Sequence, residues 1–167
     1  RLPNKMLLPF YSFKGGLELL LEKLSNSFNN LPIIVATTES QKDDKIVELC
    51  LKYKVNYFRG SENNVLERFI DVGTHFDLEQ IIRICADNPF LSIKDLNFLI
   101  QRFQNSDLDY LSFQTSKGVP AIKTQYGFWA EAVSLEALKK IQKNTDSLIY
   151  LEHVTNYIYE NLKKFNT

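Results

Sequence analysis

Apolar residues recur along the chain with the spacing of helix faces. In "LELLLEKLSNSF", Leu17, Leu20, Leu21 and Leu24 fall three or four positions apart, as on one side of an amphipathic helix. Several further segments show the same period, and Ser, Asn or Asp residues suited to capping precede some of them. We therefore predict helices over 17–27, 42–54, 65–76, 93–104, 134–144 and 152–165.

Short apolar runs rich in β-branched residues lie between these helices. "LPIIVATT" carries Pro32 near its start, where a strand tolerates proline, and "QIIRICA" is apolar apart from Arg83. The predicted strands cover 31–38, 55–58, 80–86, 108–113 and 128–134. Strands that alternate with helices of this length indicate βαβ units and a mostly parallel sheet buried on both faces.

The composition fits one α/β domain spanning residues 1–167. Hydrophobic residues make up 44% of the chain, and 20 Lys and Arg balance 20 Asp and Glu, so no broad basic surface for nucleic acid is expected. Cys50 and Cys85 lack metal-site spacing and are expected to be buried thiols. There is no signal peptide and no apolar stretch of the roughly 20 residues that a membrane span needs, so we expect a soluble, cytoplasmic protein. Because the chain lacks an initial Met and a clear stop, it is expected to be a fragment, truncated at both ends.

Polar residues gather where the predicted strands end, which is where open parallel sheets bind ligands. They are Thr37, the run Arg59-Gly60-Ser61, and Asp87 with Asn88. Asp87 suits Mg²⁺ held jointly with substrate phosphates, but it equally suits a cap on the loop before the next helix. The loop at Gly60 and Ser61 could read a base or simply begin a helix.

Other candidates also carry two interpretations. Arg1 and Lys5 could grip a triphosphate, or could be ordinary charges near a chain end. Glu131 lies in an apolar run, where a carboxylate is costly unless it is paired or metal-bound, although an exposed edge strand would also explain it. His153 could act as a base, ligand or substrate contact, or could cap a helix, whereas His75 is expected to be structural.

Five motifs occur in one order along the chain: "RLPNKMLLP", "IIVATT" followed by "DDKI", "FRGSENNVLERF", "IIRICADNPF" and "EHVTNYIY". This series resembles the cytidylyltransferase family of spore-coat polysaccharide type. That family is related to the enzymes that make CMP-activated sialic acid and CMP-3-deoxy-manno-octulosonate. The similarity runs from residue 1 to about residue 160.

The resemblance implies a three-layer α/β/α fold of the nucleotide-diphospho-sugar transferase, Rossmann-like type. It also implies the Mg²⁺-dependent reaction of CTP with a sugar to give a CMP-sugar and pyrophosphate for surface polysaccharide synthesis, and a possible homodimer. The resemblance implies Arg1 and Lys5 on the triphosphate, Asp87 on Mg²⁺, Arg59, Gly60 and Ser61 close to the base, Glu131 on a second metal or the sugar, and Glu152, His153 and Thr155 near the acceptor. Thr37 and Asn88, at the strand ends, are further candidate substrate contacts.

The sequence departs from the family at its start. The first strand and the glycine loop that relatives carry before Arg1 are not in this chain, and that strand would lie in the middle of the sheet. The alternative to an enzyme is therefore a non-catalytic nucleotide- or sugar-binding module within a longer protein. Among enzymes, another base such as UTP is the alternative, and the acceptor stays open among a nonulosonic acid, a sugar phosphate and a polyol.

Overall fold

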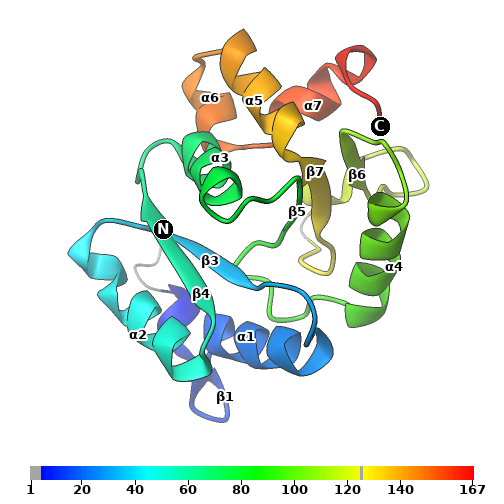
Figure 1. The fold of residues 1–167 in the computed structure, drawn as a ribbon. Coiled ribbons are helices and arrows are strands. Elements are labelled where there is room, and N and C mark those ends of the chain that lie inside the picture. Colours follow the sequence, from blue (N-terminus) through cyan, green and yellow to red (C-terminus); the bar gives the residue numbers. More distant parts are fainter. Residues whose placement is uncertain (1–4, 125) are drawn as a thin grey trace.

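The computed structural model describes residues 5–124 and 126–167, and in it helices lie on both sides of the β-strands (Figure 1). The helices are α1 (Gly16–Ser27), α2 (Asp44–Tyr53), α3 (Val65–His75), α4 (Ile93–Gln104), α5 (Leu135–Asn144), α6 (Leu148–Glu152) and α7 (Asn156–Glu160). The strands are β1 (Pro9–Tyr11), β2 (Lys14–Gly15), β3 (Ile34–Thr38), β4 (Asn56–Gly60), β5 (Gln80–Arg83), β6 (Tyr110–Ser112) and β7 (Glu131–Ser134). Single 3₁₀ turns are η1 (Lys5–Leu7), η2 (Gln41–Asp43), η3 (Ala121–Lys123) and η4 (Leu162–Lys164).

Helices α1 to α5 confirm the first five predicted helices to within a few residues. The starts of α3, α4 and α5 are fixed by side chains that accept hydrogen bonds from otherwise unpaired backbone N–H groups. Asn64 caps α3, Ser92 caps α4 and Ser134 caps α5 in this way. Local sequence signals therefore decide where these helices begin.

The prediction of a mostly parallel sheet is wrong. Among the strands that the structure describes, only β3 and β4 pair side by side in parallel, whereas β7 lies between β5 and β6 and is antiparallel to both. A parallel return from β6 would need a crossover, usually a helix, and the described part of 113–130 holds only the short turn η3. The chain therefore re-enters the sheet in the opposite direction. No described strand joins β3 to β5, so the strands form separate sheets.

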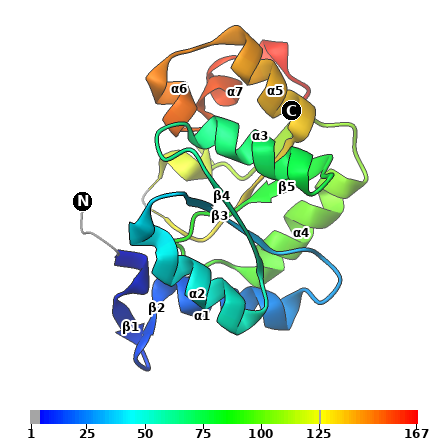
Figure 2. The ribbon, with the colours of Figure 1, turned by 60° about the vertical axis from the view of Figure 1, so that its left-hand side comes forward.

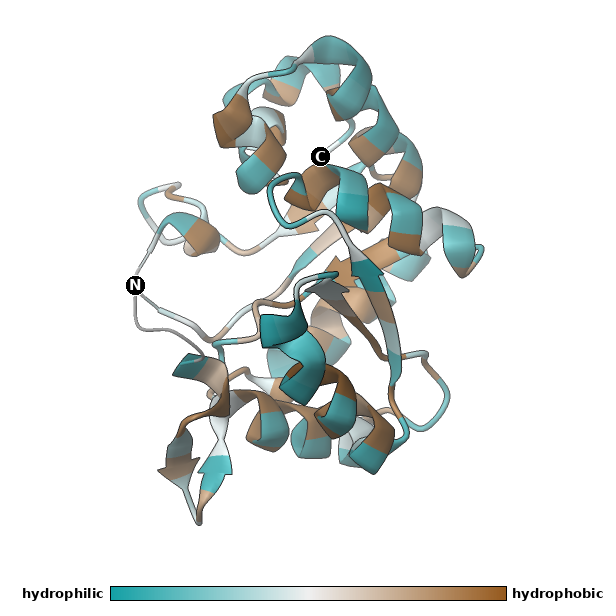
Figure 3. Cartoon of the chain, turned by 90° about the vertical axis from the view of Figure 1, so that its left-hand side faces the viewer, coloured by the Kyte–Doolittle hydropathy of each residue, from teal (hydrophilic) through white to brown (hydrophobic). Residues whose placement is uncertain are grey.

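Alternate residues of β5 and β7 face opposite helical layers. Ile81 and Val133 lie in the core formed with α3, α5 and α7, whereas Ala132 lies in the core formed with α1 and α4, against which Ile82 packs. A third cluster joins α1 to α2. In Figure 3 the outer faces of the helices are largely teal, which marks hydrophilic residues. The brown, hydrophobic segments mostly face inward. The expected covering of both faces of the strands by helices is thus confirmed.

The predicted helix over 152–165 is wrong, because the chain breaks into α6, a turn, α7 and η4. The break falls at His153, whose φ of −105° and ψ of 77° are not helical. Val154 and Thr155, which follow it, are buried at 0% and 2% exposure. Burial of these two side chains overrides the helical period of the segment.

A small hairpin of β1 and β2 was not predicted. Its tip holds Ser12 and Phe13 at positive φ (50° and 62°), and Phe13 is 98% exposed. Two-residue hairpins with positive φ at both positions normally use Gly or Asn, so the sequence lacks the usual signal. The hairpin projects from the lower end of the molecule in Figure 2.

Both cysteines carry free thiols; Cys50 is buried, as expected, whereas Cys85 is only partly buried. Within 5–124 and 126–167, none of the helices has the length and apolar character needed to cross a bilayer.

The cap at Ser134 gives a test of the junction between β7 and α5. Replacing Ser134 by Ala removes the acceptor for the Ala137 N–H, 3.1 Å away, and we expect a loss of about 1 kcal/mol in the free energy of unfolding. Urea denaturation measures it. The matched control is Ser116→Ala at an exposed turn, which should be neutral; equal stability of the two variants would contradict the capping role.

Candidate functional site

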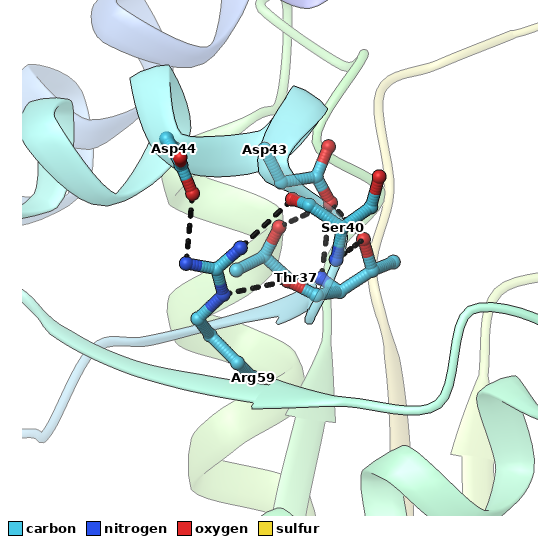
Figure 4. A network of polar contacts seen from close by, with 6 residues as sticks. Thr37, Ser40, Asp43, Asp44 and Arg59 are labelled. Carbon is cyan, nitrogen blue, oxygen red and sulfur yellow. Dashed lines mark hydrogen bonds and ion pairs between the residues drawn. The ribbon is translucent and has the colours of Figure 1, made fainter.

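The carboxyl ends of β3 and β4 meet the start of α2 in a polar network (Figure 4). Asp43 Oδ2 accepts hydrogen bonds from Thr37 Oγ1 at 2.8 Å, from Thr38 Oγ1 at 2.6 Å and from the Thr38 backbone N–H at 3.0 Å. The β-branched threonines extend the strand, and their hydroxyls then hold the first turn of the next segment. Thr37, a predicted substrate contact, is thereby buried within this network.

Arg59 spans the same edge with its guanidinium group. Its Nε donates to the Thr38 carbonyl oxygen, its Nη1 to Asp44 Oδ1 and its Nη2 to the Ser40 carbonyl oxygen, each at 2.8 Å (Figure 4). The structure thus brings Thr37 and Arg59 into one network. All three guanidinium nitrogens have protein partners, so Arg59 shapes this loop, and its predicted contact with a base stays a prediction.

Gly60 and Ser61 leave the strand edge beside Arg68. Ser61 Oγ accepts from the Asn64 N–H at 3.1 Å, and the Ser61 carbonyl oxygen accepts from Arg68 Nη1 at 2.6 Å. A Cβ atom at Gly60 would lie 3.1 Å from Arg68 Cγ, which makes glycine the residue that fits there with least adjustment. Arg68 Nε is buried and has no hydrogen-bond partner among the described residues.

Hydrogen bonds hold Asp43 in its charged form. Burial alone would raise its pKa, but the hydroxyls of Thr38 and Thr37 and the Thr38 N–H outweigh burial, and nearby Arg68 adds to them. The pKa of Asp43 therefore lies below its ordinary value. A carboxylate is thus available to orient both threonines at neutral pH.

Asp87 lies in the turn after β5 and pairs with Lys5. Lys5 Nζ donates to Asp87 Oδ2 at 2.5 Å, with the two side chains 52% and 43% exposed. Phe10 and Phe90 also meet edge to face, with ring centroids 5.7 Å apart. Two contacts therefore join the η1–β1 segment to the turn that follows β5.

The same turn is fixed from its other side by the segment before β7. A Cβ atom on Gly127 would lie 2.7 Å from Asn88 Oδ1, so only glycine permits this approach without a shift. The Ser92 N–H donates to the Phe128 carbonyl oxygen at 2.8 Å. Asn88 thus packs against the chain that leads to Glu131.

Glu131 is buried, at 3% exposure, in a polar cluster. Arg83 Nη1 donates to its Oε2 at 2.6 Å, Tyr110 OH donates to its Oε1, and Thr155 Oγ1 lies 3.2 Å and 3.0 Å from Oε1 and Oε2. Arg83 and Glu131 face each other directly across β5 and β7. The structure therefore brings together two predicted site residues, Glu131 and Thr155.

The charges of this cluster shift the pKa values of its neighbours. Burial first, and then the charge of Glu131, raises the pKa of Tyr110 well above its usual value. Burial works to lower the pKa of Arg83, but Cys85 and Glu131 outweigh it and the pKa rises. Burial, Glu131 and Glu160 raise the pKa of Tyr159 to about 12. The arrangement therefore keeps the guanidinium charged and the phenols protonated.

The remaining predicted residues belong to neither of these polar networks. His153 is exposed in the turn after α6, where its carbonyl oxygen accepts from the Asn156 N–H, and Glu152 is exposed at the end of α6. Arg1 lies outside the described residues. His75 packs against the rings of Phe58 and Phe76, as a structural histidine would.

Among the predicted metal ligands that the structure describes, Asp87 suits a magnesium ion better than Glu131 does. Mg²⁺ usually binds through one or two carboxylates together with substrate phosphates and water, and Asp87 offers a carboxylate in a turn that is open to solvent. Glu131 is less suited to bind a metal ion, because both of its carboxylate oxygens already accept hydrogen bonds from protein groups. Across 5–124 and 126–167, no cluster of three or more His, Cys, Asp or Glu side chains is arranged to hold a metal. The predicted second metal at Glu131 stays a prediction.

Sequence reasoning missed Asp43, Arg68, Arg83 and Tyr110. A signal existed for Arg83, because it is the one charge in an apolar predicted strand while Glu131 is the one acid in another. Two opposite charges in two buried strands favour pairing. Asp43 and Arg68 lie within the motifs DDKI and FRGSENNVLERF, but their positions in predicted helices did not mark them as partners of the strand ends.

The fold is of the α/β class, and in such folds polar groups at the carboxyl ends of strands, flanked by helical layers, are where ligands are usually bound. Comparison with known proteins narrows this class: a model of the cytidylyltransferase family matches residues 1–167. The chain belongs to the cytidylyltransferase family.

Known proteins agree with this assignment. The spore coat polysaccharide biosynthesis protein SpsF of Bacillus subtilis is 32% identical over 167 residues, covering 95% of this chain and 64% of SpsF. A cytidylyltransferase structure from Leptospira borgpetersenii serovar Hardjo-bovis matches with a TM-score of 0.88 at 29% identity, over 99% of this chain and 68% of that one. A CMP:2-keto-3-deoxy-manno-octonic acid synthetase complexed with CTP matches in fold, with a TM-score of 0.68 at 13% identity, over 98% of this chain and 80% of that one. The chain spans 64% of the length of the curated relatives that it matches.

The lowered pKa of Asp43 predicts how pH affects the β3–β4 edge. A carboxyl whose pKa is lower in the folded than in the unfolded state stabilises the fold fully above its ordinary pKa of 3.8, and less as the pH falls. Asp43→Asn should therefore cost about 1 kcal/mol at pH 7, and the difference from the natural chain should shrink below about pH 4.

Thermal unfolding of both proteins from pH 3 to pH 7 measures this difference. Asp146→Asn, at an exposed loop position, is the matched control and should show no such trend. A stability gap for Asp43→Asn that stays constant across this range would show that the charge of Asp43 does not matter.

Proposed function

We propose that this chain transfers CMP from CTP to a sugar and releases pyrophosphate, for surface polysaccharide synthesis. The family match over residues 1–167 is the observation that carries the proposal. The likeness to SpsF supports a role in polysaccharide synthesis, and the likeness in fold to a synthetase complexed with CTP supports the choice of nucleotide. The reaction forms a bond between an acceptor oxygen and the α-phosphorus and breaks the bond to the departing pyrophosphate.

The turn at Asp87 is the proposed phosphate side of the site. Lys5, next to Asp87, is a mobile point charge that would offset the negative charge gathering on pyrophosphate as it leaves. Asp87 would hold Mg²⁺, which when bound supplies charge neutralisation to phosphate oxygens. By the family resemblance Arg1 joins Lys5 in this role.

The network at the ends of β3 and β4 is the proposed nucleoside side. Arg59 fixes the course of the loop through Ser40, and Arg68 does the same for the Ser61 carbonyl group. The loop at Gly60 and Ser61 is thereby held in one conformation before a base arrives. Preorganised loops of this kind lower the entropic cost of binding.

The acceptor side is proposed to lie beside the turn between α6 and α7. Glu152 and His153 are exposed there, and Thr155 anchors the turn to Glu131. Transfer of this type depends on positioning and charge stabilisation more than on covalent work by the protein. The proton of the attacking hydroxyl leaves to solvent or to a nearby basic group.

The direct experiment incubates the full-length protein with Mg²⁺ and each of CTP, UTP, ATP and GTP. The acceptor panel contains nonulosonic acids, sugar phosphates and polyols, and pyrophosphate release is measured. We expect release with CTP and one acceptor class. Binding of CTP without pyrophosphate release for any acceptor would instead favour the non-catalytic module.

Asp87→Asn gives a sharper test of the phosphate side. The variant keeps the shape of the side chain and removes its charge, so Mg²⁺-dependent pyrophosphate release should fall by at least about 100-fold while the fold is kept. Asp77→Asn is the matched control, because Asp77 has a φ of 53°, which Asn tolerates, and follows α3 at the amino end of β5. Full activity in Asp87→Asn would refute the role of Asp87.

A further inference from the structure

The buried cluster around Glu131 joins four segments of the chain. Its other members are Arg83 at the end of β5, Tyr110 at the start of β6, and Thr155 in the turn between α6 and α7. We name these four residues the Glu131 cluster. They are distant in sequence and meet only because β7 lies between β5 and β6.

The carboxylate of Glu131 is fully engaged within this cluster. Its Oε2 accepts from Arg83 and its Oε1 accepts from Tyr110, while the Thr155 hydroxyl lies within 3.2 Å of both oxygens. Glu131, Tyr110 and Thr155 are 3%, 4% and 2% exposed. Hydrogen bonds from several sides fix the orientation of a buried carboxylate.

Stability alone does not explain such a cluster. The cost of removing two charges from water largely cancels their attraction, and well-packed apolar residues are often as stabilising. A fully satisfied polar network instead selects one arrangement of the segments that carry it. The Glu131 cluster is therefore better suited to fixing geometry than to adding stability.

The segments that it fixes lead to the two sides of the proposed site. Arg83 lies four residues before Asp87, and Thr155 lies two residues after His153. Arg83 donates to Glu131 and Asp87 accepts from Lys5, so the short stretch of chain from Arg83 to Asp87 carries both contacts. The cluster thus connects the turn after β5 with the turn after α6.

We propose that the Glu131 cluster is a positioning device that sets the acceptor side of the site relative to the phosphate side. Glu131, oriented by Arg83 and Tyr110, holds the Thr155 hydroxyl and through it the turn that presents Glu152 and His153. Thr155 then acts through Glu131 and is a positioning residue. This inference rests on the proposed function, since it concerns the transfer between those two sides.

A pair of substitutions at Thr155 separates the hydroxyl from the shape of the side chain. Thr155→Val keeps the shape and removes the hydroxyl, whereas Thr155→Ser keeps the hydroxyl. With the acceptor identified by the panel above, Thr155→Val should lower kcat/KM for the acceptor roughly 10- to 100-fold, because small misplacements are costly in transfer reactions. Thr155→Ser should retain most of the activity of the natural chain. In both variants the Kd for CTP with Mg²⁺, measured by calorimetry, should stay within about twofold of the natural value.

The coupling to Glu131 has its own measurement. Glu131→Gln combined with Thr155→Val should be no slower than Glu131→Gln alone, because residues that act through one interaction are not additive. Multiplied losses would mean that Thr155 acts independently of Glu131 and would overturn the inference. Thr74→Val removes a hydroxyl that donates to the Ile70 carbonyl oxygen within α3, and as control it should leave kcat/KM unchanged.

Amide hydrogen exchange distinguishes failure of this inference from failure of the proposed function. In Thr155→Val the amides of Asn156 and Ile158, which donate to His153 and Thr155, should exchange faster, while Thr155→Ser should match the natural chain. Unchanged exchange with normal activity would refute the positioning role and leave the transferase proposal intact. If no nucleotide and acceptor pair releases pyrophosphate, the transferase proposal fails, and the positioning role in transfer fails with it.

Discussion

The ladder between β5 and β7 carries the arrangement on which the site depends. Its end places Arg83 opposite Glu131, one charge from each strand, inside a core where neither would be tolerated alone. Shifting the register by one residue would turn Arg83 and Glu131 toward opposite faces and leave both unpaired. The pair therefore fixes the register, and the register fixes where the turn at Asp87 leaves the strand.

Two kinds of polar chemistry surround the candidate site, and they differ in their access to water. The network at the ends of β3 and β4 and the Glu131 cluster are largely satisfied by protein partners and shape the backbone. The side chains of Lys5 and Asp87 are about half exposed. Breaking this ion pair so that each residue can bind a ligand therefore costs little free energy. This contrast separates residues that build the site from those suited to meet a substrate.

Helix positions were largely predictable from the sequence, while strand order was not. The caps at Asn64, Ser92 and Ser134 are local signals, and the structure uses them as expected. The direction of β7 depends on how a long loop returns, and the break at His153 depends on burial of Val154 and Thr155. Both are decided by contacts between residues far apart in sequence, which a local pattern does not contain.

The sequence by itself determined the layered α/β class and the resemblance to cytidylyltransferases, which the family match bears out. Periodicity and capping suffice for these, because they act over a few neighbouring residues. The strand ends as places for chemistry stay a prediction. Only the tertiary structure decided that Glu131 pairs with Arg83. It also decided that Arg59 donates hydrogen bonds to backbone carbonyl groups and to Asp44. Partners for a buried charge are chosen by which strands become neighbours, and that choice belongs to the folded chain as a whole.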